Sequence, residues 1–306
     1  MKGTYRSLKA LVHWQEAERP IDWATRFGRT APLEIEIGFG NGEYLIKQAL
    51  ENPDRNYVGV ELHWESVKRL LRRIHYTGAG NIRVLLGDAP VVLDRLFKPR
   101  SAERIYSLFP CPWPKERHTR HRLFSTKFFR LMNSRIVDHG DAQIVTDHEQ
   151  YFEWICGQLP GCGFAFEWKT TPPAYNTKYE RKWEAGGKQL YFDLQLRKEI
   201  HEDLPFKEDV ELKTYRIEHF DPDSFEPADV YGKVVVAFKD FLFDREREKG
   251  ILKAVVAEED LHQTVWIEIA RTGKSWMIRP VQGGGALPTV GLQTALDQVK
   301  KATDPA

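Results

Sequence analysis

The residues of this sequence best suited to bind a ligand are three carboxylates and three glycines at or just after the ends of predicted strands. They are Glu36, Glu61, Asp88, Gly38, Gly40 and Gly42. In an open α/β sheet, ligands bind beyond the carboxyl ends of the strands, so these residues should meet at one edge of the sheet. Glycine has no β-carbon, which lets the backbone turn tightly and come close to a bound nucleoside.

Each carboxylate can be matched to one part of a nucleoside cofactor. Glu61 can accept hydrogen bonds from both hydroxyls of a ribose, and Asp88 can accept one from an adenine amino group. Glu36 lies beside the glycine turn, where an anion can face the positively charged methionine portion of S-adenosylmethionine (SAM). We therefore predict SAM as the cofactor.

A dinucleotide site is the main alternative, because it also needs glycines after a first strand and an acid about 20 residues later. Its fingerprint is G-x-G-x-x-G, whereas this chain has G-x-G-x-G preceded by Glu36. An acid at that position would repel a pyrophosphate. The spacing favours SAM.

The elements that must position these residues alternate between strands and helices. Strands are predicted at residues 33–38, 57–61, 83–86, 104–109 and 143–146, and helices at 42–50, 64–76, 123–137 and 149–159. Two further strands, 164–169 and 189–196, have no helix of full length between them and should form an antiparallel edge. The pattern predicts a Rossmann-like α/β sheet, mainly parallel, as in class I methyltransferases.

The chain is predicted to have three parts. Residues 1–32 form an N-terminal arm, residues 33–200 a SAM-dependent methyltransferase domain, and residues 201–306 a small accessory α+β domain of unassigned role. Residues 1–200 carry 31 Lys and Arg against 24 Asp and Glu, and residues 201–306 carry 14 against 20. The basic first part suits a polyanionic partner, although such a split also occurs on ordinary solvated surfaces.

Other classes of protein are disfavoured by composition. No apolar run approaches the roughly 20 residues that a membrane helix needs, and no apolar segment typical of a signal peptide follows the start. We therefore expect no membrane partner and a cytoplasmic protein. The cysteines Cys111, Cys156 and Cys162 are odd in number and lack C-x-x-C spacing, so we expect reduced thiols and no metal. The oligomeric state does not follow from the sequence.

A proline-rich loop follows the fourth predicted strand and leads into a basic run. The loop is FPCPWPK (109–115), and the run is KERHTRHR (115–122). Prolines fix φ and bias the residues before them toward extended conformations, so the loop should be stiff. The run could neutralise several phosphates, with Trp113 or His118 stacking on a base. The alternative is a solvated helix start with scattered charge.

Four separated motifs carry a family resemblance. They are EIGFGNG (36–42), the 109–115 loop with its basic tail, Thr146-Asp147, and Thr177 to Glu180 with Lys182. In that order they resemble the bacterial tRNA (guanine-N7)-methyltransferase family, over about residues 33–196. The resemblance implies a class I SAM methyltransferase fold, tRNA as partner, and methylation of N7 of a guanine in the variable loop of tRNA.

The resemblance also assigns roles by position. Glu36, Glu61 and Asp88 match the SAM contacts of the family. The positions tied to substrate binding are matched by Lys115, Asp147, Thr177, Lys178, Tyr179 and Glu180. Thr177 could instead cap a turn, Asp147 could cap the helix that begins near Glu149, and Lys115 could be a solvated lysine.

The sequence departs from the family at one catalytic position. The family loop usually carries a catalytic, SAM-contacting Asp between its prolines, where this chain has Cys111. Asp147 and Glu180 are the next candidates for a catalytic carboxylate. Guanine N7 already has an in-plane lone pair, so transfer requires mainly in-line positioning and a general base is optional.

Cys111 is therefore expected to be a packing residue or weak donor rather than a covalent nucleophile. Two other functions remain open from the sequence. One is a tRNA-binding protein that holds SAM with little turnover, which the missing Asp would explain. The other is a SAM methyltransferase with a substrate other than tRNA, which would leave the basic run without a role.

Overall fold

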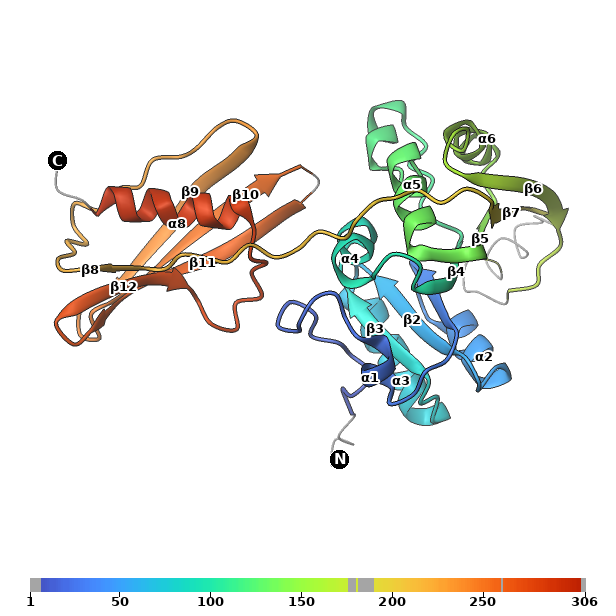
Figure 1. Cartoon of the computed structure of the whole chain (residues 1–306), viewed down its shortest axis with the longest axis horizontal. Coiled ribbons are helices and arrows are strands. Elements are labelled where there is room, and N and C mark those ends of the chain that lie inside the picture. The colour runs from blue at the N-terminus through green and yellow to red at the C-terminus, as the bar shows by residue number, and fades with distance from the viewer. Residues whose placement is uncertain (1–6, 176–179, 181–189, 260, 304–306) are drawn as a thin grey trace. The chain divides into compact units, whose positions relative to one another are not determined.

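The computed structural model describes residues 7–175, 180, 190–259 and 261–303 of the chain (Figure 1). The chain folds into two compact units. The first consists of residues 1–14 and 18–207, and the second of residues 15–17 and 208–306. Each unit has its own sheet.

The first unit contains a seven-stranded sheet in the order β3-β2-β1-β4-β5-β7-β6. Its strands are β1 (Leu33–Ile37), β2 (Asn56–Glu61), β3 (Ile82–Leu86), β4 (Ala102–Leu108), β5 (Ile136–Thr146), β6 (Phe164–Thr171) and β7 (Tyr191–Lys198). The first five pair in parallel, whereas β7 runs antiparallel to both β5 and β6. The predicted parallel sheet with an antiparallel edge is confirmed.

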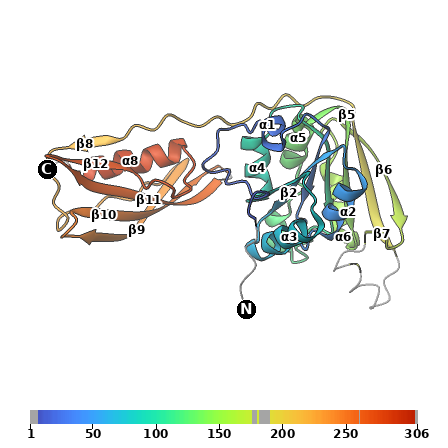
Figure 2. The same ribbon diagram turned by 90° about the horizontal axis from the view of Figure 1, so that it is seen from below.

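Helices cover both faces of this sheet. They are α1 (Trp23–Phe27), α2 (Glu43–Glu51), α3 (Trp64–Thr77), α4 (Ala89–Leu96), α5 (Thr126–Arg135) and α6 (Glu149–Gln158). The pair α2 and α3 lies on one side, and α4 with α5 on the other (Figures 1 and 2). With a helical layer on each face, β1 and β2 are buried along their whole length.

Both predicted ends of one helix are wrong. The helix expected over residues 123–137 begins only after Ser125, whose side chain accepts a hydrogen bond from the amide of Phe128. It ends before Ile136, which is already extended and begins β5. Apolar residues such as Ile136 and Val137 fit the buried face of a helix or a strand equally well, so periodicity could not place this boundary. Helix α4 was not predicted.

The N-terminal arm of the first unit pairs with the outer edge of β3. Val84 donates its amide to Ala10 O at 2.7 Å and accepts from the amide of Val12 at 2.9 Å. The indole of Trp14 donates to Leu86 O at 2.9 Å. These bonds satisfy backbone groups of a strand that would otherwise form an open edge.

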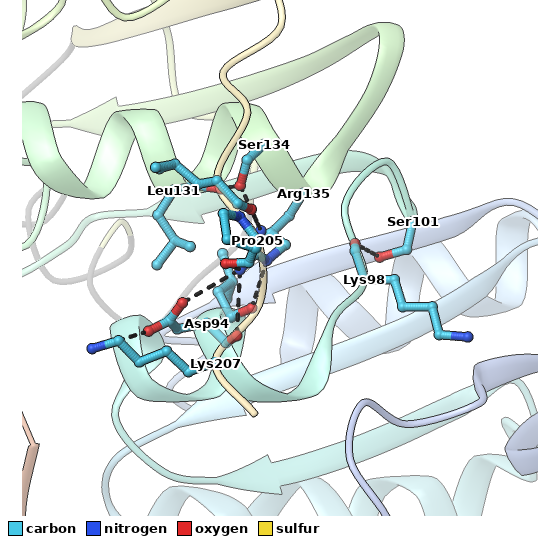
Figure 3. A network of polar contacts seen from close by, with 10 residues as sticks. Asp94, Lys98, Ser101, Leu131, Ser134, Arg135, Pro205 and Lys207 are labelled. Atoms are coloured by element: carbon cyan, nitrogen blue, oxygen red, sulfur yellow. Dashed lines mark hydrogen bonds and ion pairs between the residues drawn. The ribbon is translucent and has the colours of Figure 1, made fainter. Parts of the chain in front are cut away.

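A fully buried arginine at the end of α5 binds the chain that leaves the first unit. The guanidinium of Arg135 donates to Leu93 O at 2.9 Å, to Leu204 O at 2.6 Å and to Pro205 O at 3.2 Å (Figure 3). Its charge lies 3.4 Å from the carboxylate of Asp94. A buried guanidinium is stable only when its donors are satisfied, so residues 204 and 205 are held as part of this unit.

The second unit is a five-stranded antiparallel sheet with a helix packed on it. The sheet order is β8-β12-β11-β10-β9. The elements are β8 (Tyr215–Ile217), β9 (Val234–Asp244), β10 (Lys249–Glu258), β11 (Leu261–Thr272), β12 (Ser275–Pro280) and α8 (Val290–Ala302). Leu292, Leu296 and Val299 of α8 join the buried core formed by the strands. The predicted α+β character of this region is confirmed.

Candidate active site

The carboxyl ends of β1, β2 and β3 lie side by side in the first unit. Glu36 is the fourth residue of β1, and Glu61 is the last residue of β2. Asp88 follows β3 as the exposed residue that precedes α4. The amide of Gly87, beside Asp88, donates to Glu61 O at 2.9 Å. The structure therefore brings the three predicted carboxylates to one edge of the sheet.

The three glycines form the turn between β1 and α2, and all have positive φ. The angles are 73° at Gly38, 54° at Gly40 and 69° at Gly42, a region that other L-residues enter at a cost of about 1–2 kcal/mol. A β-carbon on Gly42 would lie 2.6 Å from Cδ1 of Leu70 in α3. A β-carbon on Gly38 or Gly40 would meet no atom within 4 Å. Gly42 is thus required for packing, whereas Gly38 and Gly40 border open space that suits a nucleoside.

Glu61 is buried and holds the glycine turn against the end of β2. Its Oε2 accepts a hydrogen bond from the amide of Gly40 at 3.1 Å. Its Oε1 accepts from the amides of Leu62 at 2.9 Å and His63 at 3.1 Å. A carboxylate has about four lone-pair sites, so Glu61 retains the capacity to accept from further hydroxyl donors.

Glu36 is a buried carboxyl group whose bonding is incomplete. Its side chain is 3% exposed, and its Oε2 has no hydrogen-bond partner among the described residues. Burial raises the pKa of Glu36 to about 8, with a further contribution from the charge of Glu61. A buried polar atom without a partner is costly. A ligand that places a cationic group here would remove that cost, and the cationic methionine portion of SAM has the required charge.

The environment of Glu36 includes three tyrosines that the sequence analysis did not identify. Tyr106 of β4 is paired with Glu36 in the register of the sheet. Its hydroxyl makes no well-formed hydrogen bond to the described residues, but it lies close enough to the Glu36 carboxyl to oppose part of the rise in pKa. Tyr44 of α2 contacts the rings of Tyr106 and Tyr175 at 5.7 and 5.5 Å. These rings come from separate segments, so sequence spacing gave no signal for the cluster.

The proline-rich loop after β4 contains two residues with a strained backbone conformation. Phe109 and Trp113 both have positive φ, at 57° and 44°, and such residues persist only where their surroundings hold them. The amide of Phe109 donates to Val145 O at 2.7 Å, and its ring packs against Tyr191 at 5.0 Å. The loop is therefore fixed by tertiary contacts as well as by its prolines.

Arg122 has a structural role that its place in the basic run did not reveal. Its Nε donates to Pro112 O at 3.0 Å. Its guanidinium lies over the rings of Tyr151 and Trp154 of α6, at 5.5 and 5.2 Å. Arg122 thus connects the loop to α6. Nothing in the sequence distinguishes it from the other cations of the run.

The remaining cations of the run face solvent around an aromatic cluster. Residues 116–121 form a short 3₁₀ helix, η1 (Glu116–His121). The rings of His118 and His121 lie 5.8 and 5.2 Å from the ring of Trp113, which is 36% exposed. Within the described part of the chain, no ion pair involves the exposed side chains of Lys115 and Arg117. These groups are suited to stack on a base and to bind phosphates.

Cys111 lies exposed in the middle of the loop, between Pro110 and Pro112, and its thiol is free. Asp147 directly follows β5 and is partly exposed. The capping residue of α6 is His148, whose Nδ1 accepts from the amide of Tyr151 at 3.3 Å. The catalytic role considered for Asp147 stays a prediction, and so does the packing or weak-donor role expected of Cys111.

Glu180 is buried, with 1% exposure. Its Oε1 accepts hydrogen bonds from the amides of Ala174 at 2.7 Å and Tyr175 at 3.1 Å. The hydroxyl of Tyr175 in turn donates to Asp193 at 3.3 Å. Glu180 thus orders the segment before it, and its predicted contact with substrate stays a prediction. The predicted substrate residues Thr177, Lys178 and Tyr179 lie outside the described residues.

The described residues contain no helix long and apolar enough to cross a membrane. They also contain no group of three or more His, Cys, Asp or Glu side chains arranged to hold a metal ion.

The strand order, the glycine turn after β1 and the acids that end β1 and β2 define a class I methyltransferase. A family model described as "Putative methyltransferase" matches residues 30–192. A tRNA (guanine-N(7)-)-methyltransferase of Chlorobium phaeobacteroides is 41% identical over 169 residues, which are 55% of this chain and 83% of the relative. The chain belongs to the tRNA (guanine-N7)-methyltransferase family.

Some relatives match this chain beyond the first unit. A protein of the same name from Thermus thermophilus is 31% identical over 278 residues, 88% of each chain. Another from Aquifex aeolicus is 28% identical over 303 residues, 94% of this chain and 97% of the relative. The motif resemblance covered only about residues 33–196, so these matches extend the similarity into the second unit.

Proposed function

We propose that this chain transfers the methyl group of SAM to N7 of a guanine in the variable loop of tRNA. The observation that carries the proposal is the buried carboxyl group of Glu36, two residues before Gly38, whose Oε2 has no hydrogen-bond partner among the described residues. The names of the relatives support the choice of guanine N7 and of tRNA.

The cofactor would be held by the three carboxylates and the glycine turn. Glu36 would bind the cationic amino group of SAM, Glu61 the ribose hydroxyls and Asp88 the adenine amino group. Gly38 and Gly40 leave the backbone bare where a nucleoside would approach. SAM, when bound, supplies a methyl group on a positively charged sulfur that is open to attack by a lone pair.

The loop and the basic run would hold the RNA. Trp113 offers an exposed ring for stacking, and Lys115 and Arg117 are exposed cations for phosphates. The strained backbone at Phe109 and Trp113 keeps this loop in one conformation. Holding N7 in line with the methyl group is the main contribution required of the protein, and such positioning can be worth roughly 7–11 kcal/mol.

The test is to incubate the protein with radiolabelled SAM and unmodified tRNA, and to map the label by borohydride and aniline cleavage. We expect label at one guanine of the variable loop. Absence of label in tRNA, with SAM binding confirmed by calorimetry, would overturn the proposal. Glu61→Ala serves as the control, because it should lose both SAM binding and labelling.

A second candidate is a tRNA-binding protein that holds SAM with little turnover, and Cys111 in place of the family Asp favours it. Single-turnover kinetics separate the two candidates. An active enzyme methylates a stoichiometric amount of tRNA within minutes, whereas the binding protein retains labelled SAM and tRNA without transfer.

A further inference from the structure

The second unit contains a hollow whose charge differs from that of the rest of the unit. It has a volume of about 830 Å³ and is bordered by β8, β12 and the last turn of α8, which meet at one end of this unit (Figure 1). The cations that line it are Arg216, Arg245, Arg271, Lys274 and Lys300. Five of the 14 Lys and Arg of residues 201–306 thus line the hollow, but only three of the 20 Asp and Glu do. Positive charge is thus concentrated at this hollow, although residues 201–306 as a whole are acidic.

Two of these cations are available to bind an anion. Arg271 pairs with Glu248 at 3.4 Å, and Arg245 pairs with Asp223. Arg216 and Lys274 are exposed, and neither takes part in an ion pair within the described part of residues 208–303. Binding an anion would therefore cost them no existing partner.

The floor of the hollow is aromatic and rigid. Trp276 of β12 is 4% exposed, and the rings of Phe220 and Phe243 lie 5.2 and 6.1 Å from it. The guanidinium of Arg271 lies 5.6 Å from the Trp276 ring, within cation-π range. Strand β12 is also the neighbour of β8, which carries Arg216. Arg216 and Arg271 thus lie on strands of one sheet, and Lys274 lies in the turn between β11 and β12.

We propose that this hollow binds backbone phosphates of the tRNA substrate, as a contact separate from the 115–122 run. The hollow is open and four of its five cations are exposed, so each gains little from one phosphate, and a polyanion that touches several at once fits it best. A second contact on the same RNA would strengthen binding through effective concentration. The inference relies on the proposed function for the identity of the RNA.

The experiment compares two charge-reversal variants of the full chain. In the first, Arg216→Glu and Lys274→Glu alter the hollow. In the control, Lys233→Glu and Lys239→Glu make the same change of charge at exposed positions of this unit that do not line the hollow. Binding of tRNA without SAM is measured by filter retention over a series of salt concentrations, and melting temperatures show whether each variant is folded.

We expect the hollow variant to bind tRNA roughly tenfold more weakly than the control, with a salt slope lower by about two, because two phosphate contacts are lost. The milder pair Arg216→Ala and Lys274→Ala should show the same loss of slope if charge reversal unfolds the unit. Equal affinities and equal slopes for hollow variant and control would overturn the inference. If polyglutamate displaces bound tRNA as effectively as competing tRNA of the same charge, the inference is also overturned, in favour of an acidic protein partner.

The methylation assay separates this inference from the proposed function. If both hold, the hollow variant raises KM for tRNA and keeps kcat. If the wild-type chain fails to methylate tRNA but the hollow variant still loses tRNA binding, the proposed function is wrong and the inference stands. If the wild-type chain methylates tRNA and the hollow variant binds it like the control, only the inference is wrong.

Discussion

The carboxylate of Glu61, at the end of β2, accepts a hydrogen bond from the backbone amide of Gly40 at 3.1 Å. This bond joins the second strand to the turn that follows the first, across 21 residues of sequence. It fixes the turn beside the group predicted to bind ribose. The side chain predicted to bind ribose thus also shapes the turn beside it.

Glu61→Gln should weaken SAM binding by about tenfold, which corresponds to about 1.4 kcal/mol. The amide NH₂ of Gln would face one of the backbone donors that Glu61 now satisfies, at Gly40, Leu62 or His63. Calorimetry with SAM measures the effect. Glu65→Gln is the control, because Glu65 is exposed and its one ion pair among the described residues is with Lys68. An unchanged Kd for Glu61→Gln would show that this carboxylate has no part in cofactor binding.

SAM affinity should rise with pH up to about 8, the pKa to which burial raises Glu36. Below that pH the free protein keeps Glu36 protonated, and a cationic ligand must displace the proton. Titrations at several pH values measure the slope. Glu36→Gln should bind SAM weakly and lack the part of the pH dependence that comes from Glu36. The same variant corrects for titration of SAM itself. Identical pH profiles for both proteins would contradict the assignment.

Glu36 also predicts how stability depends on pH. Its pKa in the folded state lies above the ordinary glutamate value of 4.5, so the native protein binds more protons than the unfolded chain between pH 4.5 and about 8. The free energy of unfolding should therefore fall as pH rises through this window. Glu36→Gln needs no ionisation, so it should raise the melting temperature more at pH 8 than at pH 5. Equal effects at both pH values would be evidence against a raised pKa.

Cys111→Ala should keep most of the turnover, within about threefold, because transfer to N7 depends on positioning. Cys111→Asp should raise kcat by up to about tenfold, since a carboxylate stabilises developing positive charge better than a thiol. Both variants are assayed with saturating tRNA and SAM. Complete loss of activity in a folded, SAM-binding Cys111→Ala protein would overturn positional catalysis. No gain from Cys111→Asp would indicate that the loop follows a different course from the family pattern.

Gly42→Ala should lower the free energy of unfolding by about 2–3 kcal/mol. Part of this cost is the positive φ of 69°, and part is the contact of a β-carbon with Leu70. Gly78→Ala isolates the first part, because Gly78 has a φ of 71° and open space around its Cα, and it should cost only about 1 kcal/mol. Urea denaturation compares the two. If both variants lose the same free energy of unfolding, α3 shifts at Leu70 to make room for the added β-carbon.

The sequence was informative where local chemistry and topology agree. Alternation of strands and helices predicted the sheet, and topology then brought Glu36, Glu61 and Asp88 to one edge without any knowledge of contacts. The sequence misplaced the end of α5 at Ile136, because the same apolar pattern fits a helix and a strand. It did not predict α4, because eight residues show little periodicity.

By itself, the sequence determined the class of fold, the glycine turn and the family, because these depend on residue types at fixed spacing along the chain. Only the tertiary structure decided which of these residues hold the protein together. It showed that Arg122 donates a hydrogen bond to the proline-rich loop and that Glu180 accepts from the amides of Ala174 and Tyr175. It also showed that Glu61 accepts from the amide of Gly40. It also left an oxygen of Glu36 without a partner among the described residues. The physical reason is that burial and hydrogen bonding arise between segments distant in sequence, and no spacing rule records them.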